Sequence, residues 1–246
     1  MIRCGKIVRV AGMAVLGCTA LHGSVARAQT SGSTAVGIGW LRVMPQGNSD
    51  PVVVESAGGV PVNQSISGTG AHVGAANAVS IMAEHQFTDH IGIAFLAGSP
   101  FTSNLIGNGS WAGYGVIGKA KPLAPVLEVR YHFLAPDAKF RPFLGAGVNY
   151  TWFSDTRITN GQFVSDSCGP GCSTRASLSP SWNPVVEAGL NYAFSKHWSI
   201  NASVTYIPLT TTLTTNATTA AGAEVVTKMR IKADPLITHL DMVYTF

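Results

Sequence analysis

The stretch 236–246 alternates as a strand with two distinct faces would, and it finishes on an aromatic residue. One parity comprises Leu236, Thr238, Leu240, Met242, Tyr244 and Phe246, and the other comprises Ile237, His239, Asp241, Val243 and Thr245. An apolar strand with an unpaired edge invites aggregation, and closing the sheet into a barrel removes that edge by pairing the last strand with the first. In lipid this closure is obligatory, and the outward face must be apolar with aromatic residues at both interfaces. The pattern therefore predicts an outer-membrane β-barrel.

Residues 1–28 resemble a secretory signal peptide. Arg3, Lys6 and Arg9 precede a charge-free, mostly apolar run over 10–21, and the small residues Ala26 and Ala28 then frame a cleavage site. We expect cleavage between Ala28 and Gln29, so that 29–246 forms the mature barrel. Two alternatives are weaker. The apolar run is short for a transmembrane anchor, and a lipoprotein signal at Cys18 would have Val15 where Leu is usual.

The basic residues of the segment 1–28 account for the whole excess of positive charge in the chain. The remaining 29–246 are formally neutral, so no basic patch argues for nucleic acid. Mean hydropathy is positive, yet no apolar run long enough to span a membrane as a helix follows the signal. Hydrophobicity of this kind is typical of alternating barrel strands.

Eight strand-like segments can be counted in the mature chain, and their even number places both termini of the chain on the periplasmic side. They cover 36–44, 73–87, 91–106, about 120–133, 140–153, 182–194, 198–206 and 236–246. Several carry aromatic residues near both ends of their apolar face, as two membrane interfaces require. In the first strand Arg42 shares the apolar parity, which indicates either a bulge or a position at the rim.

The connections alternate between short and long. Tight turns at 88–90, 134–139 and 195–197 alternate with long segments at 46–72, 107–119, 155–181 and 213–224, which are rich in Gly, Ser, Thr and Asn. Short periplasmic turns and long extracellular loops are the pattern of an eight-stranded antiparallel transmembrane barrel. The stretch 210–222 is interpreted as a mobile loop.

Parity also predicts what lies inside. With the aromatic residues facing lipid, the charged and histidine side chains that turn inward are Glu84, Glu128, Arg130, His132, Glu187, His239 and Asp241. They form either a structural network that fills a narrow interior or a polar floor that closes a conduit. Other inward positions, including Gly92, Gly145 and Gly189, are small and are expected to leave space for a slender apolar ligand.

Four blocks of the sequence, in order, resemble the OmpW family of outer-membrane proteins. They are 89–101, 121–127, 139–150 and the Asp234-Pro235 pair before the final strand. The resemblance implies an eight-stranded barrel with a narrow hydrophobic lumen, associated with passage of small hydrophobic molecules that leave either axially or sideways between strands. It also implies that Leu96 and Thr205 lie where the lumen narrows. Thr205 departs from the bulky aromatic residue expected there, which implies a wider or differently placed gate.

Cys168 and Cys172 are the cysteines that remain after the signal, in a loop that is not a feature of the family pattern. An exported chain permits a disulfide between them, and free thiols are the alternative. A metal site would need more ligands nearby, and the histidines of the chain are scattered, so we expect neither metal nor cofactor.

Three functions are compatible with these sequence features. The first is a passive outer-membrane channel for small hydrophobic molecules. The second is a plugged structural or surface-interaction barrel whose extracellular loops bind partners. The third is a lipid enzyme, but no motif assembles His239 and Asp241 with Ser199 or Ser203 into a triad, so we expect no enzyme. Expected partners are outer-membrane lipids, small hydrophobic ligands and, through the last strand, the outer-membrane insertion machinery.

Overall fold

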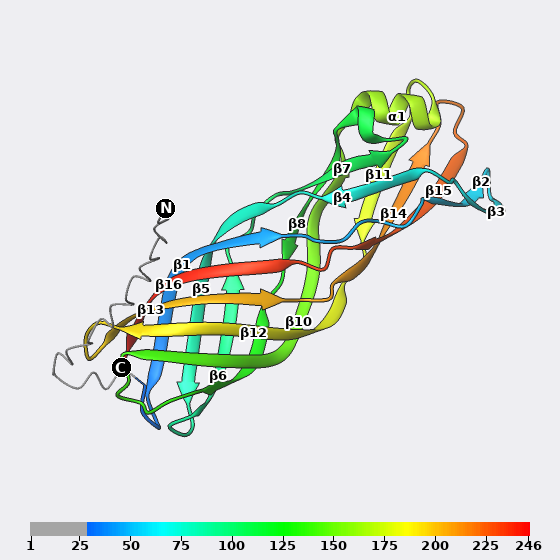
Figure 1. Ribbon diagram of the computed structural model, residues 1–246. Helices are drawn as coiled ribbons and strands as arrows, with labels where there is room; N and C mark the ends of the chain where they lie inside the picture. Colours follow the sequence, from blue (N-terminus) through cyan, green and yellow to red (C-terminus); the bar gives the residue numbers. More distant parts are fainter. Residues whose placement is uncertain (1–28) are drawn as a thin grey trace, which may run out of the picture.

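The computed structural model describes residues 29–246, and its main feature is a closed antiparallel β-barrel (Figure 1). The predicted signal segment, including Ala28, lies outside the described residues. Eight strands form the barrel: β1 (Thr34–Met44), β5 (Ala76–Gln86), β6 (Ile91–Gly98), β9 (Val126–His132), β10 (Phe140–Ile158), β12 (Ser181–Ala193), β13 (Trp198–Tyr206) and β16 (Leu236–Thr245). The predicted fold class is confirmed.

The last strand closes the barrel against the first. β16 pairs with β1 in a register that sets Val36 opposite Tyr244, and its other edge pairs with β13. Phe246 extends the ladder by donating its backbone N–H to the carbonyl of Thr34 at 2.9 Å. Because both edges of β16 are paired, the apolar terminal strand presents no free edge for aggregation.

Alternating burial along the strands confirms the predicted division into lipid-facing and inward-facing side chains. In β16 the side chains of Leu240 and Met242 are 51% and 43% exposed on the outer face, whereas Asp241 and Val243 are 2% and 1% exposed. Arg42 lies at the end of β1, where the pairing with both neighbours continues without a shift. It is therefore a rim residue and not part of a bulge.

The long connections between barrel strands contain further strands and two short helical segments. They continue the barrel wall at the end opposite to the C-terminus (Figure 1). The elements there are β2 (Val53–Ala57), β3 (Val60–Ser65), β4 (Thr69–Val73), β7 (Ser103–Gly109), the 3-10 helix η1 (Ala112–Tyr114), β8 (Val116–Leu123), α1 (Gly161–Cys168), β11 (Ser173–Leu178), β14 (Thr210–Thr218) and β15 (Glu224–Lys232). The interpretation of 210–222 as a mobile loop is wrong, because most of this stretch forms strand β14. Its threonines are β-branched and favour extended backbone once a partner strand is present.

Three predicted strands are also split by the structure. The segment 91–106 divides into β6 and β7, 120–133 divides between β8 and β9, and 73–87 begins in β4 and resumes at Ala76. The first two breaks coincide with Pro100 and Pro125, which cannot donate to a ladder. At these breaks the chain passes from the barrel proper into its extension.

Buried apolar side chains form two clusters. One lies in the barrel around Leu96, Val126 and Ile207, and the second lies in the extension around Ile117, Phe163 and Met229. Val73 packs against both clusters, so the two cores adjoin. Within residues 29–246 no helix has the length and apolar character needed to cross a membrane.

Candidate functional site

A buried ionic network crosses the barrel interior toward the end of the short turns. Its centre is Arg130, which has no solvent exposure. The guanidinium contacts three carboxylates: Nε lies 2.6 Å from Glu128 Oε1, Nη1 lies 3.0 Å from Glu84 Oε2 and Nη2 lies 2.7 Å from Glu187 Oε2. These carboxylates come from β9, β5 and β12. The network therefore ties together strands on different sides of the barrel.

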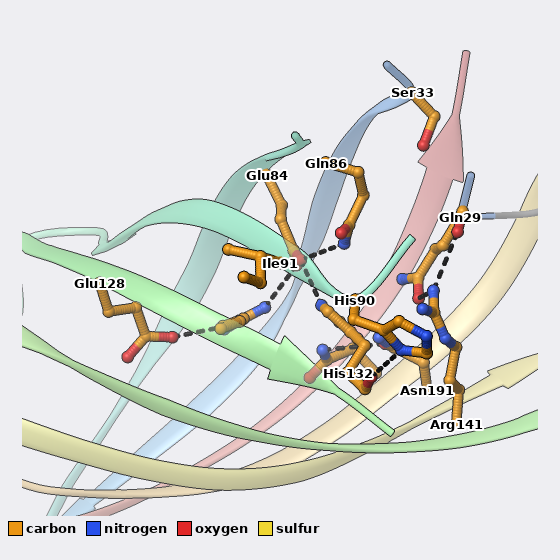
Figure 2. A network of polar contacts seen from close by, with 12 residues as sticks. Gln29, Ser33, Glu84, Gln86, His90, Ile91, Glu128, His132, Arg141 and Asn191 are labelled. Atoms are coloured by element: carbon orange, nitrogen blue, oxygen red, sulfur yellow. Dashed lines mark hydrogen bonds and ion pairs between the residues drawn. The ribbon is translucent and has the colours of Figure 1, made fainter. Parts of the chain in front are cut away.

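Hydrogen bonds extend this network from Glu84. His132 Nε2 and Gln86 Nε2 lie 2.5 Å and 2.6 Å from Glu84 Oε1, and Figure 2 shows both side chains meeting that carboxylate. On the opposite side Thr205 Oγ1 donates to Glu187 Oε1 at 3.3 Å. The ring of Phe143 lies under Arg130, with the guanidinium carbon 4.6 Å from the ring centroid. We call Glu84, Glu128, Arg130, His132 and Glu187 the polar floor.

The two remaining charged or histidine positions predicted from parity are also inside. Asp241 accepts a hydrogen bond from Ser80 Oγ, and His239 is buried and lines the cavity described below. All seven inward positions predicted from the alternation thus have buried side chains. Five of them form the polar floor, and His239 and Asp241 lie outside its set of direct contacts.

Below the floor lies a second closure that the sequence analysis missed. Arg141 Nη1 donates to the backbone carbonyl of Gln29 at 2.9 Å and to its Oε1 at 3.2 Å, and Nη2 donates to the carbonyl of Asp89. Figure 2 shows Gln29 and Arg141 side by side. Arg141 has inward parity in β10, so the alternation could have identified it. No local pattern pointed to Gln29.

The small inward residues do not leave free space at this level, which corrects the prediction. A Cβ atom on Gly92 would lie 2.7 Å from Glu84 Oε1, and one on Gly145 would lie 3.0 Å from the Glu128 carboxylate. A Cβ on Gly189 would collide with the ring of Phe143. These glycines make room for the polar floor and its aromatic support, and not for a ligand.

The free space lies above the floor, in a cavity of about 140 Å³. We call it the lumen cavity. Its lining begins at Thr205 and His239, includes Leu96, and continues past Ile207 into the extension. Thr205 belongs to both structures, because its hydroxyl bonds the floor while its side chain lines the cavity. The predicted narrowing residues Leu96 and Thr205 thus lie on the same cavity.

The wall of the lumen cavity has a break in its hydrogen bonding. The ladder between β6 and β9 ends at Leu96 and Val126, and the ladder between β7 and β8 starts only at Ser103 and Ala120. Between these points no backbone pairing joins 97–102 to 121–125 in the described chain. Pro100, Pro122 and Pro125 lie in the two segments and lack the N–H that pairing needs. Phe101 and Ala124 line the cavity at this break, which we call the side gap.

The extension carries the cysteine pair. Cys168 ends α1, and the structure joins it by a disulfide to Cys172, with the two Cα atoms 6.0 Å apart. Such a bridge closes a very small loop and fixes the C-terminal end of the helix next to β11.

A closed barrel with apolar side chains outside, aromatic residues near the strand ends and an ionic interior is an integral outer-membrane protein. The comparisons with known proteins agree. The model of the OmpW family matches residues 31–246, and the chain belongs to this family.

Two relatives and one solved structure are similar to this chain. Outer membrane protein W of Vibrio cholerae is 31% identical over 221 residues, which cover 87% of this chain and 88% of that protein. The Pseudomonas aeruginosa protein named dibenzothiophene metabolism operon protein PahQ is 25% identical over 178 residues, covering 72% of this chain and 75% of the relative. The crystal structure of OprG from Pseudomonas aeruginosa has the same fold, with a TM-score of 0.78, 24% identity and coverage of 89% of this chain and 98% of OprG.

Proposed function

We propose that this outer-membrane barrel is a passive channel for small hydrophobic molecules, which enter the lumen cavity from outside and leave through the side gap into the membrane. The observation that carries the proposal is the position of an apolar cavity between the polar floor and the side gap, where no backbone pairing joins 97–102 to 121–125. The permeant class follows from the lining, which is mostly apolar.

The polar floor favours a sideways route over an axial one. An apolar molecule that passed along the barrel axis would have to separate Arg130 from carboxylates with which it is fully buried. Breaking a buried ion pair costs about 3–5 kcal/mol, and an apolar solute offers no polar group in compensation. At the side gap no hydrogen bonds need to break, because none join its two segments.

The name of one relative supports the same class of permeant. PahQ is named for a dibenzothiophene metabolism operon, and dibenzothiophene is a small, uncharged, apolar aromatic compound. We therefore extend the proposal to aromatic hydrocarbons and similar molecules as permeants of this barrel.

Uptake of an apolar fluorescent probe by intact cells tests the proposal. Cells that lack their own barrel of this family would produce either this protein, the variant Leu96→Trp, or the variant Leu240→Trp, and receive N-phenyl-1-naphthylamine. Leu96 lines the lumen cavity, whereas Leu240 faces lipid, so the two variants add the same ring inside and outside the barrel. We expect faster uptake with the protein and with Leu240→Trp, and uptake near the empty-cell rate with Leu96→Trp. Equal rates in all producing and empty cells would overturn the proposal.

The sealed floor also supports the second candidate, a plugged barrel that acts through its extracellular part. This function would be lost on deletion of the α1 and β11 segment and unaffected by Leu96→Trp or Glu128→Gln. Channel function, in contrast, should be lost in Leu96→Trp. The same set of variants therefore separates the two candidates.

The proposal includes no chemical reaction. His239 and Asp241 lie inside the barrel, and Asp241 is bonded to Ser80, which leaves the carboxylate engaged in a structural contact. We expect the purified barrel to leave phospholipid and lipid A unmodified on prolonged incubation, as judged by mass spectrometry of the extracted lipids.

A further inference from the structure

A second cavity lies in the extracellular extension, under helix α1. It has a volume of about 100 Å³, and its walls come from α1, from β14 and β15, and from residues near η1 and β8. Val164 and Ser167 of α1 line it on one side, and Ala217, Val225 and Met229 line it on the other. We call it the outer cavity. No charged side chain is among its lining residues.

Helix α1 is held over this cavity at both ends. Asn160 caps its first turn by accepting from Phe163 N at 2.9 Å, and its side-chain amide donates to the carbonyl of Tyr114 at 3.0 Å. The Cys168–Cys172 disulfide fixes the other end. Tyr114 Oη also donates to Asp166 at 3.0 Å, and this hydrogen bond raises the pKa of Tyr114.

An aromatic cluster forms the wall beneath the helix. The ring of Phe163 meets Trp111 and Tyr114 edge to face, with centroid distances of 5.0 Å and 5.3 Å. Phe163 and Trp111 both line the outer cavity. Aromatic faces and edges of this kind favour a planar apolar ligand, which can take an offset or edge-on position against them.

The outer cavity adjoins the lumen cavity. Ile158 at the end of β10 and Leu213 of β14 line both cavities, so these two side chains form the partition between them. We propose that the outer cavity is a separate binding site for a small uncharged apolar molecule, and that the molecule moves past Ile158 and Leu213 into the lumen cavity. The inference deepens the proposed function, because it assigns the site of capture on the same route.

Fluorine NMR gives a readout of this site that does not depend on transport. Of the five tryptophans in the chain, Trp111 lines the outer cavity. The full barrel would be labelled with 5-fluorotryptophan in micelles, the Trp111 signal assigned with Trp111→Phe, and naphthalene titrated as the probe. We expect a saturable shift of the Trp111 signal.

Three variants locate the binding. Ala217→Phe places a ring in the outer cavity and should weaken the Trp111 response by roughly tenfold or more, because the ring takes the space that a ligand needs. Val225→Phe is a second cavity-filling variant in case the first does not fold. Ala223→Phe adds the same ring at an exposed position beside the β14–β15 turn and should leave the response unchanged.

The lumen variant Leu96→Trp separates this inference from the proposed function. We expect Leu96→Trp to retain naphthalene binding at Trp111 while it loses probe uptake, and Ala217→Phe to reduce both. Naphthalene binding in the unsubstituted barrel, combined with probe uptake no faster than in empty cells, would support the site and reject the transport proposal. Any of three results would overturn the inference of a separate site. The Trp111 signal does not shift with naphthalene, or it shifts in folded Ala217→Phe and Val225→Phe as much as in the unsubstituted barrel. In the third result, the signal no longer shifts in Leu96→Trp.

Discussion

Arg130 of β9 and Glu187 of β12 meet inside the barrel, with Nη2 and Oε2 2.7 Å apart, although β10 lies between their strands in the sheet. The ion pair therefore spans two strand-to-strand spacings across the inner face. Both side chains are fully buried, so each depends on the other for its charge compensation.

Replacing Arg130 by Met should destabilise the barrel strongly. The substitution keeps much of the side-chain length but leaves three buried carboxylates without their cation, at a cost of about 3–5 kcal/mol in the free energy of unfolding. Urea unfolding in lipid bilayers, followed by tryptophan fluorescence, measures this quantity. The matched control is Arg157→Met, which removes a partly exposed pair with Asp155 and should cost less than about 1 kcal/mol. Equal costs for the two variants would contradict the structural role of the polar floor.

Gly189→Ala should destabilise the barrel by overpacking. The added Cβ would meet the ring of Phe143, and it would lie 2.7 Å from Ser203 Cβ, so a cost of about 1–3 kcal/mol is expected. In the double variant with Phe143→Leu the glycine substitution should cost less, which the same unfolding assay measures as a coupling energy. Gly113→Ala is the control, since a Cβ there has nothing within 4 Å. A neutral Gly189→Ala would contradict the close packing of Phe143 and Ser203 against this glycine.

A charge on the outer face should be costly in the middle of a strand. Leu144 of β10 is 53% exposed and lies between Phe140 and Tyr150, which mark the two ends of the apolar band on that strand. Leu144→Arg should cost about 2–4 kcal/mol near the bilayer midplane. Leu144→Ala separates the loss of the leucine from the gain of the charge. An arginine variant no less stable than the alanine variant would argue that Leu144 does not face lipid.

Filling the side gap should slow uptake without unfolding the barrel. Ala124 lines the lumen cavity at the unpaired break, so Ala124→Trp should reduce the uptake rate of N-phenyl-1-naphthylamine if molecules leave sideways. Ala146→Trp, on the exposed face of β10, is the control and should have no effect. Unchanged uptake in a folded Ala124→Trp barrel would favour an axial route instead.

The alternation of side chains determined which residues face lipid and which face inward. Glu128, Arg130 and His132 could be placed inside because successive strand residues point to opposite faces, and this rule is local to each strand. The same rule placed Leu240 and Met242 outside. Arg141 satisfied it as well and could have been included among the inward charges.

Tertiary structure decided what the inward residues do together. Which side chains meet depends on the register between neighbouring strands and on closure of the barrel, and neither is encoded in the period of a single strand. Only the closed barrel brings Glu84, Arg130 and Glu187 into one contact group, and only it shows that Gly189 makes room for Phe143.

The extension above the membrane shows the same limit of the sequence. Segments rich in threonine, glycine and asparagine give a weak strand pattern, and part of their pairing is with segments distant in the chain, as in the pairing of Val225 with Ala57. The amino-acid sequence by itself thus determined the barrel and its lipid-facing surface through a local period of two. The polar floor, the side gap and both cavities depend on contacts between distant strands, and those contacts exist only once the sheet has closed.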